Sequence, residues 1–377
     1  NGKVRLKLGG KKSCRLQSVK CSNDSLYTTQ IVNRYGRLSK YMQSERSWAV
    51  GYADNLGVFL ESLEVTVCPP KSVVMARRLH NTICRLLNTL VRVQAPLKSL
   101  SIVRLELDRF CWDEGLRNTL VKKLIYFFLK GPSRLKNVCL IRIRTETQQL
   151  NNSIPQMLQK LQSLTHLALS YSWLSDELLL ALSENGNFLE SFSLYCTQNE
   201  PHQQVVYGYS WATLVSSSPD LKVRLTLEQI VDTHELVRIL LPEIPLVEYN
   251  MTAFYSIDEN CSAKPLLQTI LPWYRHSLQN LTLDLSNCSE SLDDELLELV
   301  NVCECLVDLR VWAFLEISTV SRLLHIRMTK RITFALQVRI YTMVENIEEQ
   351  EDQLMEILSP FCYPPELQFL AVICPYI

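Results

Sequence analysis

The sequence has few glycines and none of the motifs that mark a catalytic or cofactor site. Glycine occupies 10 of 377 positions, which argues against phosphate-binding glycine loops and against sheets of tight hairpins. No Walker loop, Gly-x-Gly-x-x-Gly or Gly-x-Ser-x-Gly is present. The histidines do not follow a metal-binding spacing, and Cys303 and Cys305 are too close together for a structural zinc site. We therefore predict no metal, no cofactor and no enzymatic activity.

The sequence also lacks an excess of either charge and a long apolar run. It contains 39 Lys and Arg and 39 Asp and Glu, so no overall field attracts nucleic acid or an anionic membrane. The longest apolar run, Leu124–Leu129, is far shorter than the roughly 20 residues that span a bilayer. The 13 cysteines are scattered, as in reduced proteins. We expect a cytoplasmic or nuclear protein that binds neither nucleic acid nor membrane.

The amino-terminal residues differ in composition from the rest. The first 20 residues contain seven Lys or Arg and no acid. Blocks of like charge are usually disordered, although a targeting or nucleic-acid-binding arm is an alternative. We predict a disordered or irregular basic segment over residues 1–45 and a folded region over residues 46–377.

One motif, Leu-x-x-Leu-x-Leu with conservative replacements, recurs along the folded region. The last two apolar residues of each copy lie two positions apart, so they face one side of a short strand. Segments of helical period, such as 176–182 and 292–300, lie between copies. Clear copies begin at Leu60, Leu97, Leu135, Leu164, Leu189, Leu278, Leu306 and Leu367, and weaker ones at Leu221, Leu246 and Leu336.

These units predict a repeat architecture. One strand and one helix cannot enclose a core alone, so neighbouring units must stack. We predict an α/β fold, an irregular leucine-rich-repeat solenoid with parallel strands on the concave face and helices on the convex face. A doubly wound α/β sheet is the alternative. Ser291, followed three residues later by Asp294, predicts a capping box at the start of the 292–300 helix.

The same alternation predicts which residues face outward on the strands. The later strands combine both charge signs with aromatic residues, and Trp, Tyr and Arg often anchor protein interfaces. For Trp312, burial at a strand edge is the alternative. The acidic runs 293–295 and 345–352 are interpreted as solvated helix faces and not as acid–base groups. The predicted protein-binding residues are Asp284, Asp308, Arg310, Trp312, Arg339 and Tyr341.

Several segments resemble the leucine-rich-repeat region of F-box only proteins. The resemblance is collinear from about Leu60 to the carboxyl end, and it is greatest to the group of F-box only protein thirty-nine and its relatives. The segments are LKSLSIVRLELDRFCW (97–112), SDELLLALSEN (175–185), SWATL (210–214), LVRILLPEIPL (236–246), RHSLQNLT (275–282), SLDDELLELV (291–300) and VWAFLEIS (311–318).

The resemblance implies a non-catalytic substrate receptor of a Skp–cullin–F-box ubiquitin ligase. In such receptors the F-box binds the Skp adaptor, and through it the cullin, while the repeat region captures the protein client. Residues 1–47 show no F-box pattern, so we expect either a fragment that begins after it or a chain that has lost it. A repeat scaffold unconnected with ubiquitin is the second hypothesis, and a doubly wound hydrolase or transferase is the third.

Overall fold

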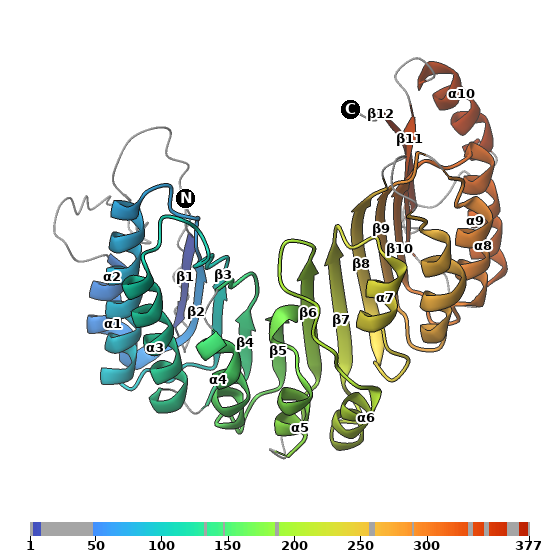
Figure 1. The fold of residues 1–377 in the computed structure, drawn as a ribbon. Helices are drawn as coiled ribbons and strands as arrows, with labels where there is room; N and C mark the ends of the chain where they lie inside the picture. The colour runs from blue at the N-terminus through green and yellow to red at the C-terminus, as the bar shows by residue number, and fades with distance from the viewer. Residues whose placement is uncertain are drawn as a thin grey trace. The chain divides into compact units, whose positions relative to one another are not determined.

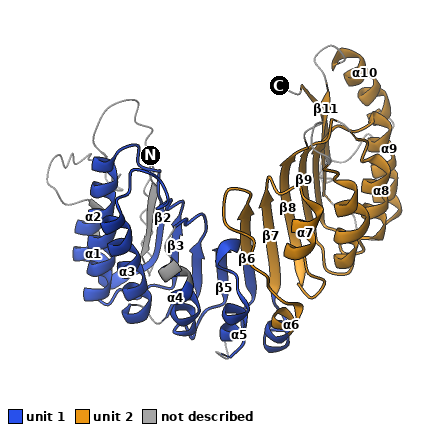
Figure 2. Ribbon diagram, in the orientation of Figure 1, with its two compact units in different colours: residues 1–192, 213–221 blue, residues 193–212, 222–377 orange. Residues whose placement is uncertain are grey.

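The computed structural model describes residues 3–8, 48–131, 134–145, 148–184, 188–255, 261–288, 290–330, 335–342, 347–359 and 369–375. Strands and helices alternate along these residues, so the chain has an α/β fold. It divides into two compact units, residues 1–192 with 213–221 and residues 193–212 with 222–377 (Figure 2). The sequence predicted one folded region from 46 to 377, whereas the structure divides it into two compact units.

In the first unit the strands are neighbours in the order of the sequence. Strands β2 to β5 run parallel, and β1 is antiparallel to β2. The elements are β1 (Lys3–Leu8), α1 (Trp48–Leu56), η1 (Gly57–Phe59), β2 (Leu60–Thr66), α2 (Val73–Arg92), β3 (Ser99–Val103), α3 (Glu114–Lys130), β4 (Asn137–Leu140), α4 (Gln148–Gln159), β5 (His166–Ser170), η2 (Tyr171–Trp173) and α5 (Asp176–Glu184).

Strand β1 differs from the irregular segment predicted over residues 1–45. Its backbone pairs with β2, with Lys3 opposite Thr66 and Arg5 opposite Glu64. Basic and apolar residues alternate over residues 3–8, which is the period of a strand. The irregular segment was predicted from the number of basic residues, which does not depend on this alternation. The other residues of the predicted basic segment lie outside the described residues.

The second unit continues the same alternation with parallel pairs from β7 to β12. Between β8 and β9, a π-helical turn and a 3-10 helix take the place of an α-helix. Strand β6 (Ser191–Thr197) and helix α6 (Gly208–Ser217) each include residues of both units. The remaining elements are β7 (Lys222–Glu228), α7 (Thr233–Ile239), β8 (Leu246–Phe254), η3 (Leu266–Ile270), η4 (Leu271–Tyr274), β9 (Asn280–Ser286), α8 (Asp293–Val302), β10 (Asp308–Ala313), α9 (Ile317–Thr329), β11 (Ala335–Thr342), α10 (Ile347–Leu358) and β12 (Phe369–Pro375).

Every copy of the Leu-x-x-Leu-x-Leu motif coincides with a strand between β2 and β12. In β9, Leu281, Leu283 and Leu285 are each 1% exposed, while the residues between them are half-buried. The predicted register is therefore confirmed in this strand. It fails at Ser170, Ser191 and Tyr195, which the alternation places outward but which are buried, and Ser170 Oγ accepts a hydrogen bond from Arg142 N. It also fails in β12, where Leu370 of the motif is 44% exposed and Ile373 is buried.

Helices lie on one side of the strands in each unit, and the other side carries none among the described residues (Figure 1). Successive helices pack against one another, from α1 to α5 in the first unit and from α8 to α10 in the second. A doubly wound sheet has helices on both faces and a reversal of strand order. The described strands of each unit show neither feature, so this alternative is wrong. No helix in the described ranges is both long and apolar enough to cross a bilayer.

Polar bonds join consecutive repeats where their strands end. The side chain of Asn287 is 1% exposed and lies just after β9. Its Nδ2 donates to Phe314 O at 3.0 Å, and its Oδ1 accepts from Phe314 N at 2.9 Å. Because an unpaired buried backbone group is costly, Asn287 stabilises the irregular segment that follows β10.

Helix α8 begins at Asp293, and its start differs from the predicted capping box. The N-cap position is Leu292, which makes no side-chain cap bond. Ser291 Oγ instead donates to Asp293 Oδ2 at 2.8 Å, inside the first turn. The helix itself is confirmed, whereas its predicted first residue and its cap are wrong.

The buried register predicts a large difference between neighbouring positions of β9. We expect Leu281→Ala to lower the free energy of unfolding by about 2–5 kcal/mol, because it leaves a cavity. Thr282→Ala, on the opposite face of the same strand, should cost less than about 1 kcal/mol. Chemical denaturation of both variants measures the difference. Equal losses would refute the register.

Candidate functional site

The six predicted protein-binding residues lie on β9, β10 and β11, on the face of the second unit without helices. We call them the open-face cluster. Across the parallel pairs, Asp284 is opposite Trp312 and Trp312 is opposite Arg339. One residue from each of three consecutive strands thus forms a row across the sheet. Whether the cluster binds a protein stays a prediction.

Asp308 and Arg310 occupy consecutive outward positions of β10 and pair with each other. Arg310 Nη2 donates to Asp308 Oδ2 at 2.7 Å, and Arg310 Nε donates to Asp308 Oδ1 at 3.3 Å. Both side chains are partly exposed, so the pair contributes little to stability. Its main effect is to cancel the two charges locally.

Asp284 and Tyr341 bond across the strand that separates them. Tyr341 Oη, on β11, donates to Asp284 Oδ1, on β9, at 2.8 Å. Partial burial and this hydrogen bond raise the pKa of the Tyr341 phenol. The phenol therefore keeps its proton, and its hydrogen bond to the carboxylate, to a higher pH than an ordinary tyrosine does. The Phe314 ring, 5.8 Å from the Tyr341 ring between centroids, packs beside it.

Trp312 and Arg339 form the remaining pair of the cluster. The Arg339 guanidinium lies 4.9 Å from the centre of the Trp312 ring, within the range of a cation–π contact. Arg339 is exposed and Trp312 is half-buried. Trp312 Nε1 is shut off from solvent and has no hydrogen-bond partner in the described part of the chain. The indole is thus neither a free surface ring nor a core residue.

A hollow of about 700 Å³ lies beside the cluster, at the carboxyl ends of β9, β10 and β11. Tyr341 lines it together with Glu290, Asp293, Glu316 and Gln350. Sequence reasoning did not find this hollow, because its walls come from the segments after two strands and from α10. A motif search along one segment cannot combine them.

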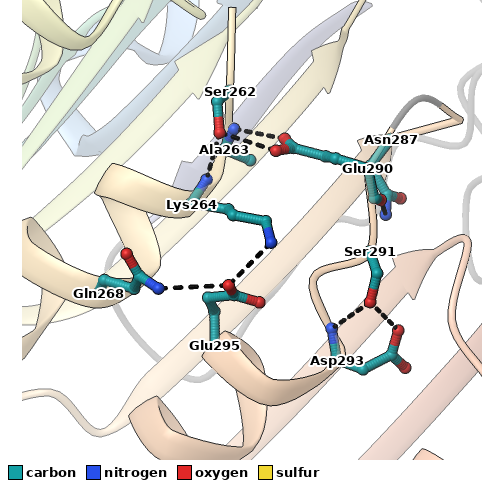
Figure 3. Close-up of polar contacts among 9 residues, drawn as sticks. All are labelled: Ser262, Ala263, Lys264, Gln268, Asn287, Glu290, Ser291, Asp293 and Glu295. Atoms are coloured by element: carbon teal, nitrogen blue, oxygen red, sulfur yellow. Dashed lines mark hydrogen bonds and ion pairs between the residues drawn. The ribbon is translucent and has the colours of Figure 1, made fainter.

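Two of the acids around α8 serve as acceptors for the preceding repeat (Figure 3). Glu290 accepts hydrogen bonds from Ala263 N at 2.6 Å and from Ser262 Oγ at 2.7 Å. Glu295 lies 3.0 Å from Lys264 Nζ, and this bond raises the pKa of the lysine ammonium. These carboxylates attach the segment before η3 to the start of α8.

Asp293 connects α8 to the following repeat. It is 6% exposed, and its Oδ1 accepts from Glu316 N at 2.9 Å and from Thr319 Oγ1 at 2.6 Å. Asp294, the next residue, is exposed and pairs with Arg322 at 2.9 Å. Consecutive helical residues point about 100° apart, so one of these two can face the next helix while the other faces solvent.

The interpretation of the acidic runs as solvated faces is therefore right in part. It is wrong for Asp293 and Glu295, which are buried, and it is confirmed for Asp294. In the second run, the acids of α10 between residues 348 and 352 are exposed as expected, and Glu345 lies outside the described residues.

The cluster offers hydrogen-bonding and aromatic groups and contains no histidine or cysteine. In the described ranges, no group of three or more His, Cys, Asp or Glu side chains could hold a metal ion. No family model matches this chain.

The contrast between Asp293 and Asp294 can be tested directly. We expect Asp293→Ala to lower the free energy of unfolding by about 2–4 kcal/mol, because Glu316 N and Thr319 Oγ1 lose their acceptor. Asp294→Ala removes the same charge from the same helix turn and should cost no more than about 0.5 kcal/mol. Urea unfolding of both variants provides the measurement. Similar losses would show that a negative charge near the helix N-terminus, and not the hydrogen bonds to the following repeat, accounts for the stabilisation.

Proposed function

We propose that this chain is the substrate-recognition region of a Skp–cullin–F-box type ubiquitin ligase. In this proposal each of the two units is built of irregular leucine-rich repeats, and the open face of the second unit binds a protein client for ubiquitylation. The receptor performs no covalent chemistry. It raises the effective concentration of a client lysine near the conjugating enzyme.

The observation that carries the client-binding part is the open-face cluster. It brings Trp312, Tyr341 and two arginines from separate strands onto one helix-free face. Such residues dominate the binding energy of many protein interfaces. The ubiquitin part is supported by the resemblance of segments such as 97–112 and 291–300 to the repeat region of F-box only proteins.

The proposal includes the Skp adaptor and the cullin as partners through an F-box that residues 1–47 do not show. A cytoplasmic or nuclear location belongs to the same proposal. A repeat scaffold unconnected with ubiquitin would use the open face in the same way, so the adaptor distinguishes the two functions.

Affinity purification of the protein expressed from its full coding sequence tests the ubiquitin part. We expect the Skp adaptor and a cullin to co-purify in stoichiometric amounts. Co-purification of other proteins without adaptor or cullin would refute the ligase role and favour the scaffold.

Substitution of the cluster tests the client-binding part. We expect Arg310→Ala combined with Trp312→Ala to reduce recovery of co-purifying clients about tenfold or more, because interface anchors are lost. The control is Arg322→Ala combined with Met355→Ala, two exposed helix positions. Thermal unfolding should stay cooperative in both double variants. Unchanged client recovery would refute the assignment of this face.

A further inference from the structure

We infer that Arg339 binds a carboxylate of the client, carried by a peptide segment that also presents an apolar side chain. This inference rests on the proposed capture of proteins by the open face. It adds the chemistry of the bound segment and identifies which residues of the cluster are available to it.

The pairings within the cluster leave one cation, Arg339, without a hydrogen-bonded or ion-paired partner among the described residues. Asp308 and Arg310 neutralise each other, and the Asp284 carboxylate accepts the Tyr341 hydroxyl. Among the charged residues of the cluster, Arg339 alone makes no hydrogen bond or ion pair in the described ranges, and its guanidinium packs against the Trp312 ring. The complementary group on a partner is therefore an anion.

The guanidinium favours one kind of anion binding. Arg presents parallel N–H donors in a plane, which match the two oxygens of a carboxylate. Stacking on Trp312 limits the rotation of the Arg339 guanidinium, so less side-chain entropy is lost when a carboxylate binds. A lysine at this position would offer neither feature.

The surroundings of Arg339 are apolar on the side of β12. Val372 is its partner in the parallel pairing, and Leu370 lies opposite Gln337, the previous outward position of β11. Leu370 is 44% exposed. An apolar side chain next to the client carboxylate would cover Leu370 and Val372, and it would exclude water from the ion pair.

Exclusion of water determines how much the ion pair between Arg339 and the client carboxylate contributes to the binding free energy. A solvent-exposed pair contributes about 0–1 kcal/mol, whereas close charge pairs buried in an interface couple more strongly. Acidic residues without an apolar neighbour are therefore expected to bind weakly.

Random peptides displayed on phage and selected against the purified chain test this inference. We expect the selected peptides to be enriched in Asp or Glu next to an apolar residue. This enrichment should disappear with Arg339→Gln and persist with Arg322→Gln, which removes an equal charge from α9. Enrichment without acidic residues, or an equal loss in both variants, would overturn the inference.

A double-mutant cycle with one selected peptide gives the decisive number. Arg339→Gln and replacement of the peptide's acid by its amide should each weaken binding about tenfold, and the two together should weaken it no further. Additive losses would show that the two groups do not meet. The peptide arm stays informative even if the protein variant folds poorly. Peptide binding through Arg339 without adaptor or cullin co-purification would support this inference while refuting the ligase role.

Discussion

The fold depends on burial of the leucine side of each strand. A single strand with its helix exposes too much apolar surface to be stable alone, so each repeat needs a neighbour. The leucines of β9 show the result, because they are almost fully buried between flanking strands and the helix layer. Stacking also leaves irregular segments between strands and helices, whose backbone N–H and C=O groups need hydrogen-bond partners outside the sheet. Buried side chains such as Asn287 and Asp293 provide those partners, and they act between consecutive repeats.

Because these stabilising bonds lie at the strand ends and the helix layer, the helix-free face is not used for them. On β9 to β11 the polar residues bond mainly to each other, so most of their hydrogen-bonding groups are already paired within the sheet. The unpaired Arg339 and the partly covered Trp312 are the exceptions. Under the proposed role, such a face selects a client by shape and by one charge contact, while the mostly paired surroundings disfavour unrelated charged proteins. Its contribution to ubiquitylation would then be positional.

The acids around α8 show why composition alone misleads. Asp293, Asp294 and Glu295 are consecutive and chemically similar. Asp293 is buried and bonds to the following repeat, Asp294 is exposed in a surface ion pair with Arg322, and Glu295 is buried and bonds to the preceding repeat. An isolated helix of this sequence would expose all three. Asp293 and Glu295 are buried because the helix is packed between two neighbours, and because each buried carboxylate finds donors there.

The sequence by itself determined the strands from β2 onward and most of their buried faces, since alternation and the leucine motif are local patterns of two to six residues. The exceptions include β12, where Leu370 of the motif is exposed and Ile373 is buried. The sequence therefore predicted the outward positions of β9, β10 and β11, and the six residues of the cluster. It did not determine the division into two units, the pairing of Tyr341 with Asp284, or the burial of Asp293. Only the tertiary structure decided these, because each depends on residues from different repeats whose approach is set by how the repeats stack. The strand at residues 3–8 belongs to the same group, since its partner is β2, more than fifty residues away in the sequence.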